Sequence, residues 1–276
     1  MKKFKKRSAK MNITHYGVLV RRQFRQIFSN AKLFVSLLLQ APVMLLIALF
    51  VYNENTFLPD YVSLFDASTI IFVLVFVSAL MGILNSYGEI CNERPVLTRE
   101  VFGGLDVTGY VLAKFTVLAL IGLAQCLILS AGALIAIDFP FTHPFAGALQ
   151  FFLALYLTNV SVAAMGLLIS SVLKNAGSAI LPVLVVILMQ VVFSEAVFPI
   201  EGAVRNLCYI TSTMWGVSLI GQSCDLNGYW MRYAGEPYKE IYDYSPVLGI
   251  AALVAVAALC LLLAVVKLKR DYKNKD

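Results

Sequence analysis

The chain has 276 residues, of which 60% are hydrophobic and 14% charged, and its formal net charge is +6. A typical soluble domain is about 45–50% apolar and about 25% charged. This composition excludes an ordinary soluble protein. It predicts an all-α integral membrane protein, because a helix satisfies its own backbone hydrogen bonds inside a bilayer.

The first 32 residues are basic, with ten Lys and Arg residues. Residues 13–28 predict an amphipathic helix that lies in the membrane interface, with Arg21, Arg22 and Arg25 on its polar side. Its apolar face consists of Ile13, Tyr16, Val20, Phe24, Ile27 and Phe28. The preceding arm is expected to contact anionic lipid, with a solvated tail as the alternative.

Six apolar stretches are long enough to span a bilayer, which requires roughly 20 residues each. They are Leu33–Val51, Ala67–Leu84, Phe115–Ile137, Phe145–Leu173, Ala176–Phe198 and Pro246–Val266. The sequence thus divides into a basic arm with an interfacial helix (1–32), a six-span transmembrane domain (33–266) and a basic tail (267–276).

The segment between the second and third stretches, residues 88–110, is unusually polar. Pro95 predicts that the second spanning helix ends near Glu93, and Gly103-Gly104 closes a short helix over Val96–Phe102. We expect charged side chains on one face of this helix and apolar ones on another. That pattern favours a surface that docks another protein, with a solvated loop as the alternative.

The last loop, residues 199–245, is long and partly apolar. Its section 203–221 predicts re-entrant or interfacial helices, since it is too polar to span and too apolar to stay in water. Cys208 and Cys224 lie in this loop, and the sequence leaves a disulfide bridge and two unpaired thiols as equal alternatives.

The distribution of basic residues predicts the orientation. Alternate crossings place nineteen Lys and Arg residues on one side of the membrane and three on the other. Because basic residues concentrate on the cytoplasmic side, we expect a multi-pass protein of the cell membrane with both termini and the 88–110 segment in the cytoplasm. The positive charge is then a consequence of topology, and nucleic acid is not an expected partner.

The chain offers few groups for catalysis. His15 and His143 are predicted on opposite sides of the membrane, so they cannot share a metal or hydrolytic site. The section Gly216–Ser223 matches a phosphate-binding loop except that Gln222 replaces its lysine. We therefore expect no catalytic residue, no metal and no cofactor on this chain.

The stretch EICNERPVLTREVFGGLDVTGYVLAK, residues 89–114, resembles the segment between the second and third spans of the G-subfamily (white-pigment type) ATP-binding-cassette exporters, a group of type 2 export permeases. The shared features are Glu93, the pair Arg99-Glu100, the glycines 103–104 and the run from Tyr110 to Lys114. The interfacial helix, QVVFSEAVFPI and YITSTMWGVSLI agree in order.

This resemblance implies that the short helix is a coupling helix that rests on an ATPase domain. Glu93, Arg94, Arg99 and Glu100 would form the coupling contact. It also implies a separate ATPase subunit, which would bind ATP and Mg, and a second transmembrane subunit, identical or related.

The resemblance further implies a central cavity lined by the second and fifth spans, here Ser78, Met81 and Leu188. A hydrophobic outer gate would fall on Ala196 and Val197, directly after Glu195, which replaces a glycine of the family. The expected function is ATP-driven export of a hydrophobic or amphipathic substrate. The alternatives are a membrane assembly or sensory subunit without transport and an ion-coupled secondary transporter.

Overall fold

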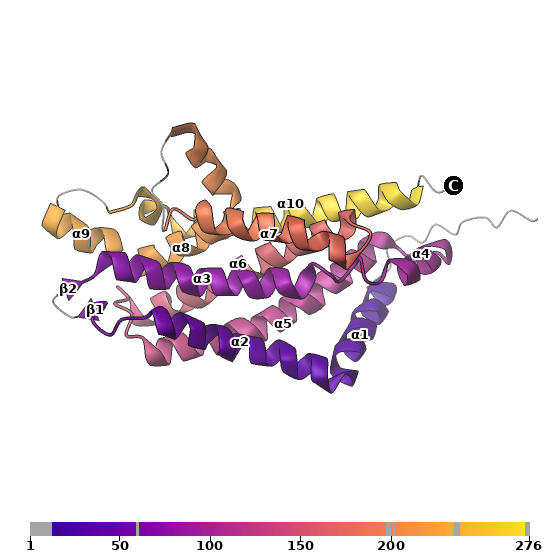
Figure 1. Ribbon diagram of the computed structural model, residues 1–276, viewed down its shortest axis with the longest axis horizontal. Coiled ribbons are helices and arrows are strands. Elements are labelled where there is room, and N and C mark those ends of the chain that lie inside the picture. The colour runs from indigo at the N-terminus through magenta and orange to yellow at the C-terminus, as the bar shows by residue number, and fades with distance from the viewer. Residues whose placement is uncertain (1–12, 59–60, 197–199, 201, 235–237, 274–276) are drawn as a thin grey trace, which may run out of the picture.

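The computed structural model describes residues 13–58, 61–196, 200, 202–234 and 238–273. Six apolar helices run roughly parallel and form a bundle (Figure 1). They are α2 (Ala31–Val51), α3 (Leu64–Ser86), α5 (Val107–Ala136), α6 (Pro144–Val172), α7 (Ala176–Val192) and α10 (Pro246–Lys273). All but the 17-residue α7 are long and apolar enough to cross a membrane. The prediction of an all-α integral membrane protein is confirmed.

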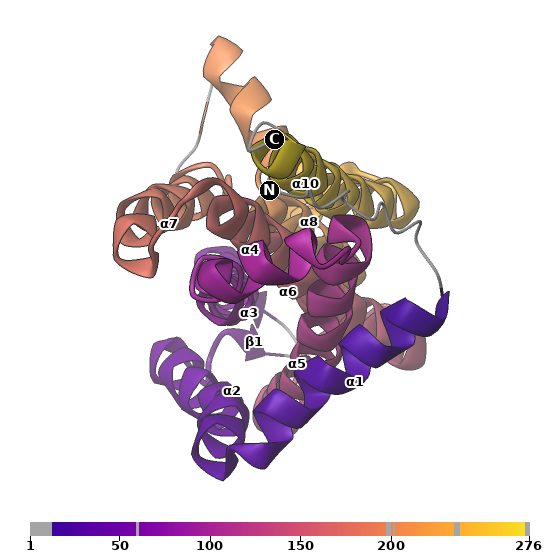
Figure 2. The ribbon, with the colours of Figure 1, turned by 90° about the vertical axis from the view of Figure 1, so that its right-hand side faces the viewer.

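Two further helices gather at one end of this bundle. Helix α1 (Ile13–Ser29) lies across the end at a steep angle to the spanning helices, and α4 (Arg94–Phe102) lies beside it (Figures 1 and 2). The start of α1 and the end of α10 are at this same end of the molecule. The described structure therefore begins and ends on the side that carries the short helix.

The centre of the bundle is a close contact of α3 with α6. At Gly82, a Cβ atom would overlap the backbone carbonyl oxygen of Asn159, and at Gly122 it would overlap the Asn159 side chain. The Asn159 amide donates a hydrogen bond to the Ser78 carbonyl at 2.9 Å. Small residues let helices approach closely in a membrane, and a buried amide then holds them together.

The opposite end of the bundle carries the 199–245 section. It contains the 3-10 helices η1 (Gly202–Ile210) and η2 (Glu240–Asp243), the helix α9 (Leu226–Ala234) and the helix α8 (Ser212–Ser223). Every residue of α8 except Gln222 is buried. This helix packs against α3, α6 and α10, so it is sheltered by protein, as the prediction of re-entrant or interfacial helices requires. A short antiparallel pair, β1 (Phe57–Leu58) and β2 (Tyr61–Val62), precedes α3.

The fifth apolar helix, α7, is shorter than the sequence predicts. It ends at Val192 rather than Phe198, because Glu195 adopts a left-handed backbone conformation with φ of 53° that a helix cannot continue through. An ion pair with Arg205 of η1, at 3.0 Å, holds the Glu195 side chain. The left-handed region favours glycine, which accounts for the glycine that the resemblance expects at this position.

The two cysteines of the 199–245 section are not joined. Cys208 and Cys224 are both buried free thiols, so the structure favours the second of the two alternatives that the sequence leaves open. Burial raises the pKa of the Cys208 thiol to about 11. A thiol with so high a pKa is almost entirely protonated at neutral pH and reacts poorly.

Candidate coupling site

The helix boundaries around Pro95 differ from the prediction. The second apolar helix ends before Glu93, and the short helix begins before Val96. Helix α3 ends at Ser86, and a turn leads to α4, which begins at Arg94. The backbone N–H groups of Ile90 and Cys91 both donate to the Ser170 hydroxyl, at 2.9 and 3.0 Å, and fix the turn against the end of α6. Pro95 lies in the first helical turn, where its missing N–H leaves no bond unmade.

The two apolar faces of α4 have different roles. Leu97 and Val101 are buried in a cluster that includes Tyr110 and Leu268. Val96 and Phe102 point outward, with 43% and 52% of their surface exposed. The sequence grouped all four apolar residues of α4 on one face, and this was wrong. Leu97 and Val101 anchor the helix, while Val96 and Phe102 remain on its outer surface.

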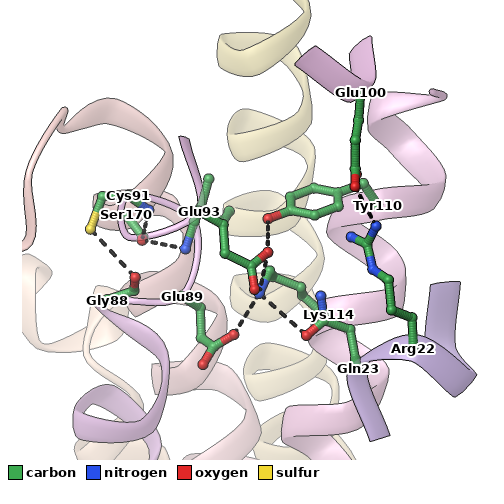
Figure 3. Close-up of polar contacts among 11 residues, drawn as sticks. Arg22, Gln23, Gly88, Glu89, Cys91, Glu93, Glu100, Tyr110, Lys114 and Ser170 are labelled. Carbon is green, nitrogen blue, oxygen red and sulfur yellow. Dashed lines mark hydrogen bonds and ion pairs between the residues drawn. The ribbon is translucent and has the colours of Figure 1, made fainter. Parts of the chain in front are cut away.

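A buried lysine lies directly behind the turn and α4. Lys114 of α5 is 1% exposed, and its ammonium lies 2.7 Å from Glu89 and 3.1 Å from Glu93 (Figure 3). The Tyr110 hydroxyl donates to the same Glu93 carboxylate oxygen at 2.8 Å, and the Gln23 side-chain oxygen of α1 accepts from Lys114 at 3.4 Å. This cluster joins α1, α5 and the turn before α4 through charge-assisted hydrogen bonds.

A second ion pair ties α4 to α1. Arg22 donates to one Glu100 oxygen at 2.6 Å, and both side chains are about one-third exposed. Glu100 Oε2 and Arg22 Nε are buried and have no hydrogen-bond partner among the described residues. The contact is therefore a single charge-assisted bond and not the paired, bidentate form.

Arg94 joins the start of α4 to two other helices. Its guanidinium donates to the Ser171 carbonyl at the end of α6 and lies 3.7 Å from Asp271 of α10. Within α4, the Thr98 hydroxyl bonds to the Arg94 carbonyl, and it also lies 3.3 Å from the Tyr272 hydroxyl. Helix α4 is thus held at its start, middle and end by α6, α10 and α1.

These contacts divide the four residues of the expected coupling contact. Glu93, Arg94 and Glu100 make ion pairs within the chain, whereas Arg99 is exposed and makes no ion pair with the residues that the structure describes. The outer surface of α4 consists of Pro95, Val96, Arg99, Phe102 and Gly103.

The sequence does not predict that Arg22, Glu89 and Lys114 hold α4 and the turn before it. One signal was available for Lys114, since a lysine early in a long apolar helix needs a buried partner. The partner itself depends on how the turn folds back, which no sequence pattern specifies.

The expected cavity residues do not share a surface in this chain. Ser78 and Met81 are both 0% exposed, and the Ser78 hydroxyl donates to the Leu155 carbonyl of α6 at 2.7 Å. Leu188 of α7 is 60% exposed. Of these three residues, only Leu188 is therefore available to line an open cavity, because Ser78 and Met81 are buried inside the bundle.

The expected outer gate lies at a polar junction. Ala196 is 8% exposed, and its carbonyl accepts hydrogen bonds from Lys239 and from the Ser68 hydroxyl. Val197 lies outside the described residues. Burial lowers the pKa of Lys239 from its ordinary 10.5 to about 8, although the nearby Glu195 carboxylate opposes this shift. The segment that follows α7 is thus hydrogen-bonded to Ser68 of α3 and to Lys239, which directly precedes η2.

No group of three or more His, Cys, Asp and Glu side chains among the described residues is arranged to hold a metal ion. The phosphate-loop-like run from Gly216 lies within α8, where its backbone N–H groups belong to a helix.

Comparison with known proteins agrees with this architecture. Residues 14–221 match the family model described as ABC-2 type transporter. The chain is also 30% identical over 222 residues to the ABC transporter ATP-binding/permease protein Rv1747 of Mycobacterium tuberculosis. The match covers 76% of this chain and 25% of that relative, so the chain spans about a quarter of the relative's length. The chain belongs to the ABC-2 type transporter family and is a multi-pass membrane permease.

Proposed function

We propose that this permease is the transmembrane subunit of an ATP-driven exporter and that α4 is its coupling helix. The observation that carries the proposal is the division of α4 into two sides. Its inner side is fixed by ion pairs to α1, α5 and α10 and by a hydrogen bond to α6, and its outer side exposes Val96, Arg99 and Phe102. An apolar pair beside an unpaired cation is a typical protein-docking surface.

The partner in this proposal is an ATPase on a separate polypeptide, which binds ATP and Mg. The name of the relative, which combines ATP binding with a permease, supports a functional pairing of these two activities. The permease itself is not expected to hydrolyse ATP. Its part is to receive a mechanical displacement at α4 and to transmit it to the spanning helices.

The ion pairs give a path for this displacement. Arg22–Glu100 joins α4 to α1, the Lys114 cluster joins the turn before α4 to α5, and Arg94–Asp271 joins its start to α10. A push on the outer side of α4 would therefore move α1, α5 and α10 with it. Rigid-body motion of such units switches a transporter between its two open states.

We further propose that the end of the bundle with α4 is cytoplasmic. The excess of Lys and Arg in the segments that reach this end supports that orientation. Both ends of the described chain would then lie in the cytoplasm, where an ATPase is available to dock.

A second transmembrane subunit, identical or related, would complete the pathway. The exposed apolar side of α7, with Leu181, Leu184 and Leu188, is a candidate wall of a cavity between the two subunits. Apolar walls favour a hydrophobic or amphipathic cargo such as a lipid, a drug-like compound or a modified peptide.

The decisive experiment compares two phenylalanine truncations. Phe102→Ala removes an exposed ring from the outer side of α4, and Phe145→Ala removes an exposed ring at the far end of the bundle. Each variant is expressed with the genes that neighbour the permease gene and purified in mild detergent. The ATPase is identified by mass spectrometry, and its stoichiometry to the permease is measured.

We expect the wild type and Phe145→Ala to retain the ATPase and Phe102→Ala to lose most of it. Arg99→Glu should act in the same direction as Phe102→Ala. Equal retention in all variants would reject α4 as the docking surface. Transport that ignores ATP depletion and responds to a proton or sodium gradient would instead support an ion-coupled carrier, and ATPase binding without any transport would support an assembly or sensory subunit.

A further inference from the structure

An apolar pocket lies in the angle between α1 and the spanning helices. It has a volume of about 90 Å³, is open on one side, and none of its nine lining residues is polar. Phe24, Ile27 and Phe28 of α1 form one wall, Phe34 and Leu38 of α2 a second, and Ala124 of α5 lies in the third. The pocket belongs to none of the contacts that hold α4.

The aromatic side chains give the pocket a defined shape. The rings of Phe24 and Phe28 stack with centroids 5.8 Å apart, and the ring of Phe28 lies 4.7 Å from that of Phe34. Phe28 is nevertheless 57% exposed, so the pocket faces the surroundings of the bundle at the level of α1. In a membrane protein, an apolar surface at that level is in contact with the bilayer.

Three exposed basic residues lie close in sequence to residues that line the pocket. Arg21 and Arg25 are exposed, and each lies three residues before one of the wall phenylalanines, Phe24 or Phe28, and thus close to it on the helix surface. Lys32 is exposed at the start of α2. Residues 13–51 contain no Asp or Glu, so no carboxylate of α1 or α2 offsets these positive charges.

We propose that this pocket is a binding site for an anionic phospholipid. Part of one acyl chain occupies the space between α1, α2 and α5, and the phosphate of the headgroup lies among Arg21, Arg25 and Lys32. The apolar lining selects a hydrocarbon chain, because a polar ligand would lose its hydrogen bonds to water without replacement. The cluster of cations selects a negatively charged headgroup over a zwitterionic one.

This site is independent of the ATPase proposed above, since it uses no residue of the outer side of α4. It does lie on the helix that Arg22 connects to Glu100. A lipid held here therefore touches the same element that supports α4 from behind.

The first test measures lipid retention on the full-length permease. The protein is purified in detergent with equal amounts of dioleoyl phosphatidylglycerol and dioleoyl phosphatidylcholine, and bound lipid is counted by native mass spectrometry. Each basic side chain near an anionic headgroup strengthens binding about fivefold. The triple variant Arg21→Gln, Arg25→Gln, Lys32→Gln should thus lose retained phosphatidylglycerol by at least about tenfold.

The matched charge control is Arg232→Gln, Lys269→Gln, Arg270→Gln, which removes the same charge at exposed positions outside the pocket. It should retain phosphatidylglycerol as the wild type does. Equal loss in both triple variants would reject the site, because only net charge would then matter. Equal retention of the two lipids by the wild type would reject it as well.

The second test fills the pocket and leaves the charges in place. Ala124→Phe occupies the space meant for the acyl chain, and Ile135→Phe adds a ring at an 86% exposed position of the same helix as its control. Ala124→Phe should lose the retained lipid and Ile135→Phe should keep it. If a correctly assembled Ala124→Phe permease retains phosphatidylglycerol at the wild-type level, the pocket does not hold the chain.

A third measurement needs no variant. A phosphatidylglycerol with a photoreactive diazirine on one acyl chain is crosslinked to the wild-type protein in vesicles, and the labelled peptides are identified. We expect labels concentrated in residues 24–38 and 120–124, which contain the pocket lining. Labels spread evenly over other exposed helices, such as α10, would overturn the proposal even if Ala124→Phe failed to assemble.

Discussion

The ammonium of Lys114 lies between the carboxylates of Glu89 and Glu93, at 2.7 and 3.1 Å, on the inner side of the turn that leads into α4. Lys114 itself is almost completely buried, whereas both glutamates are partly exposed. One cation from a spanning helix thus pairs with two anions of the turn. The position of α4 on the bundle depends on this arrangement.

Removing the Lys114 charge should loosen α4. Lys114→Met keeps the length of the side chain but leaves two neighbouring carboxylates without a counter-charge. Loss of one partner from a fully buried pair costs about 3–5 kcal/mol, and we expect about 2 kcal/mol here because both glutamates reach solvent. The measurement is the apparent melting temperature of the purified protein, which should fall by roughly 5 °C.

The control for this change is Lys267→Met. Lys267 is 38% exposed and pairs with Asp271 four residues along the same helix. Such a pair contributes about 0.3–0.5 kcal/mol, so this variant should melt close to the wild type. Similar melting temperatures for the two variants would contradict a structural role for the Lys114 cluster.

Reversing the Arg22–Glu100 pair tests whether α1 supports α4. Arg22→Glu and Glu100→Arg should each reduce ATP-dependent activity of the assembled transporter, because each creates a like-charge contact. The double variant restores an attractive pair and should recover most of the activity. The measured quantity is the coupling free energy of the double-mutant cycle, expected at about 0.5–1 kcal/mol for a partly exposed pair. Additive losses would show that the contact is unimportant.

Gly82→Ala should weaken the contact of α3 with α6. Its new methyl group would overlap the backbone carbonyl oxygen of Asn159, which cannot move away without shifting α6. Overpacking of this kind costs about 1–3 kcal/mol. Gly177→Ala is the matched control, since no atom lies within 4 Å of its added Cβ. Thermal melting should separate the two, and an unchanged melting temperature in Gly82→Ala would contradict the close packing.

Lys239 should make stability depend on pH. Its pKa is about 8 in the folded protein, against an ordinary value of 10.5. Between these two values the unfolded chain binds more protons than the folded one, so this residue raises stability as the pH increases from 8 towards 10.5. Below pH 8 the folded protein carries the full cost of a buried ammonium.

The measurement is the melting temperature of the wild type and of Lys239→Met at several pH values. The two proteins are compared at the same pH, because other groups also make stability depend on pH. Burial raises the pKa of Cys208 and Tyr242, and these groups lower stability as the pH increases in the alkaline range. The wild type should gain stability relative to Lys239→Met as the pH increases. A constant difference would show that Lys239 is not desolvated.

The sequence by itself determined the class of protein and most of its elements. Apolar runs of about 20 residues without charge specify spanning helices, because an unpaired backbone group or a charge in hydrocarbon is costly. Local patterns also predicted the amphipathic helix over residues 13–28, the short helix between Pro95 and Gly103, and re-entrant or interfacial helices over residues 203–221, where η1 and most of α8 lie. Each of these follows from local composition and from residues that start or stop a helix.

Only the tertiary structure decided which side chains meet. Glu93 directly precedes α4 and Glu100 lies within it, and the family resemblance implies that both contact a partner. They instead pair with Lys114 and Arg22, which lie 21 and 78 residues away along the chain. Ser78 is buried rather than in a cavity because α6 packs over it. Such contacts depend on how the helices rotate and approach one another, and periodicity along a single chain does not encode that rotation.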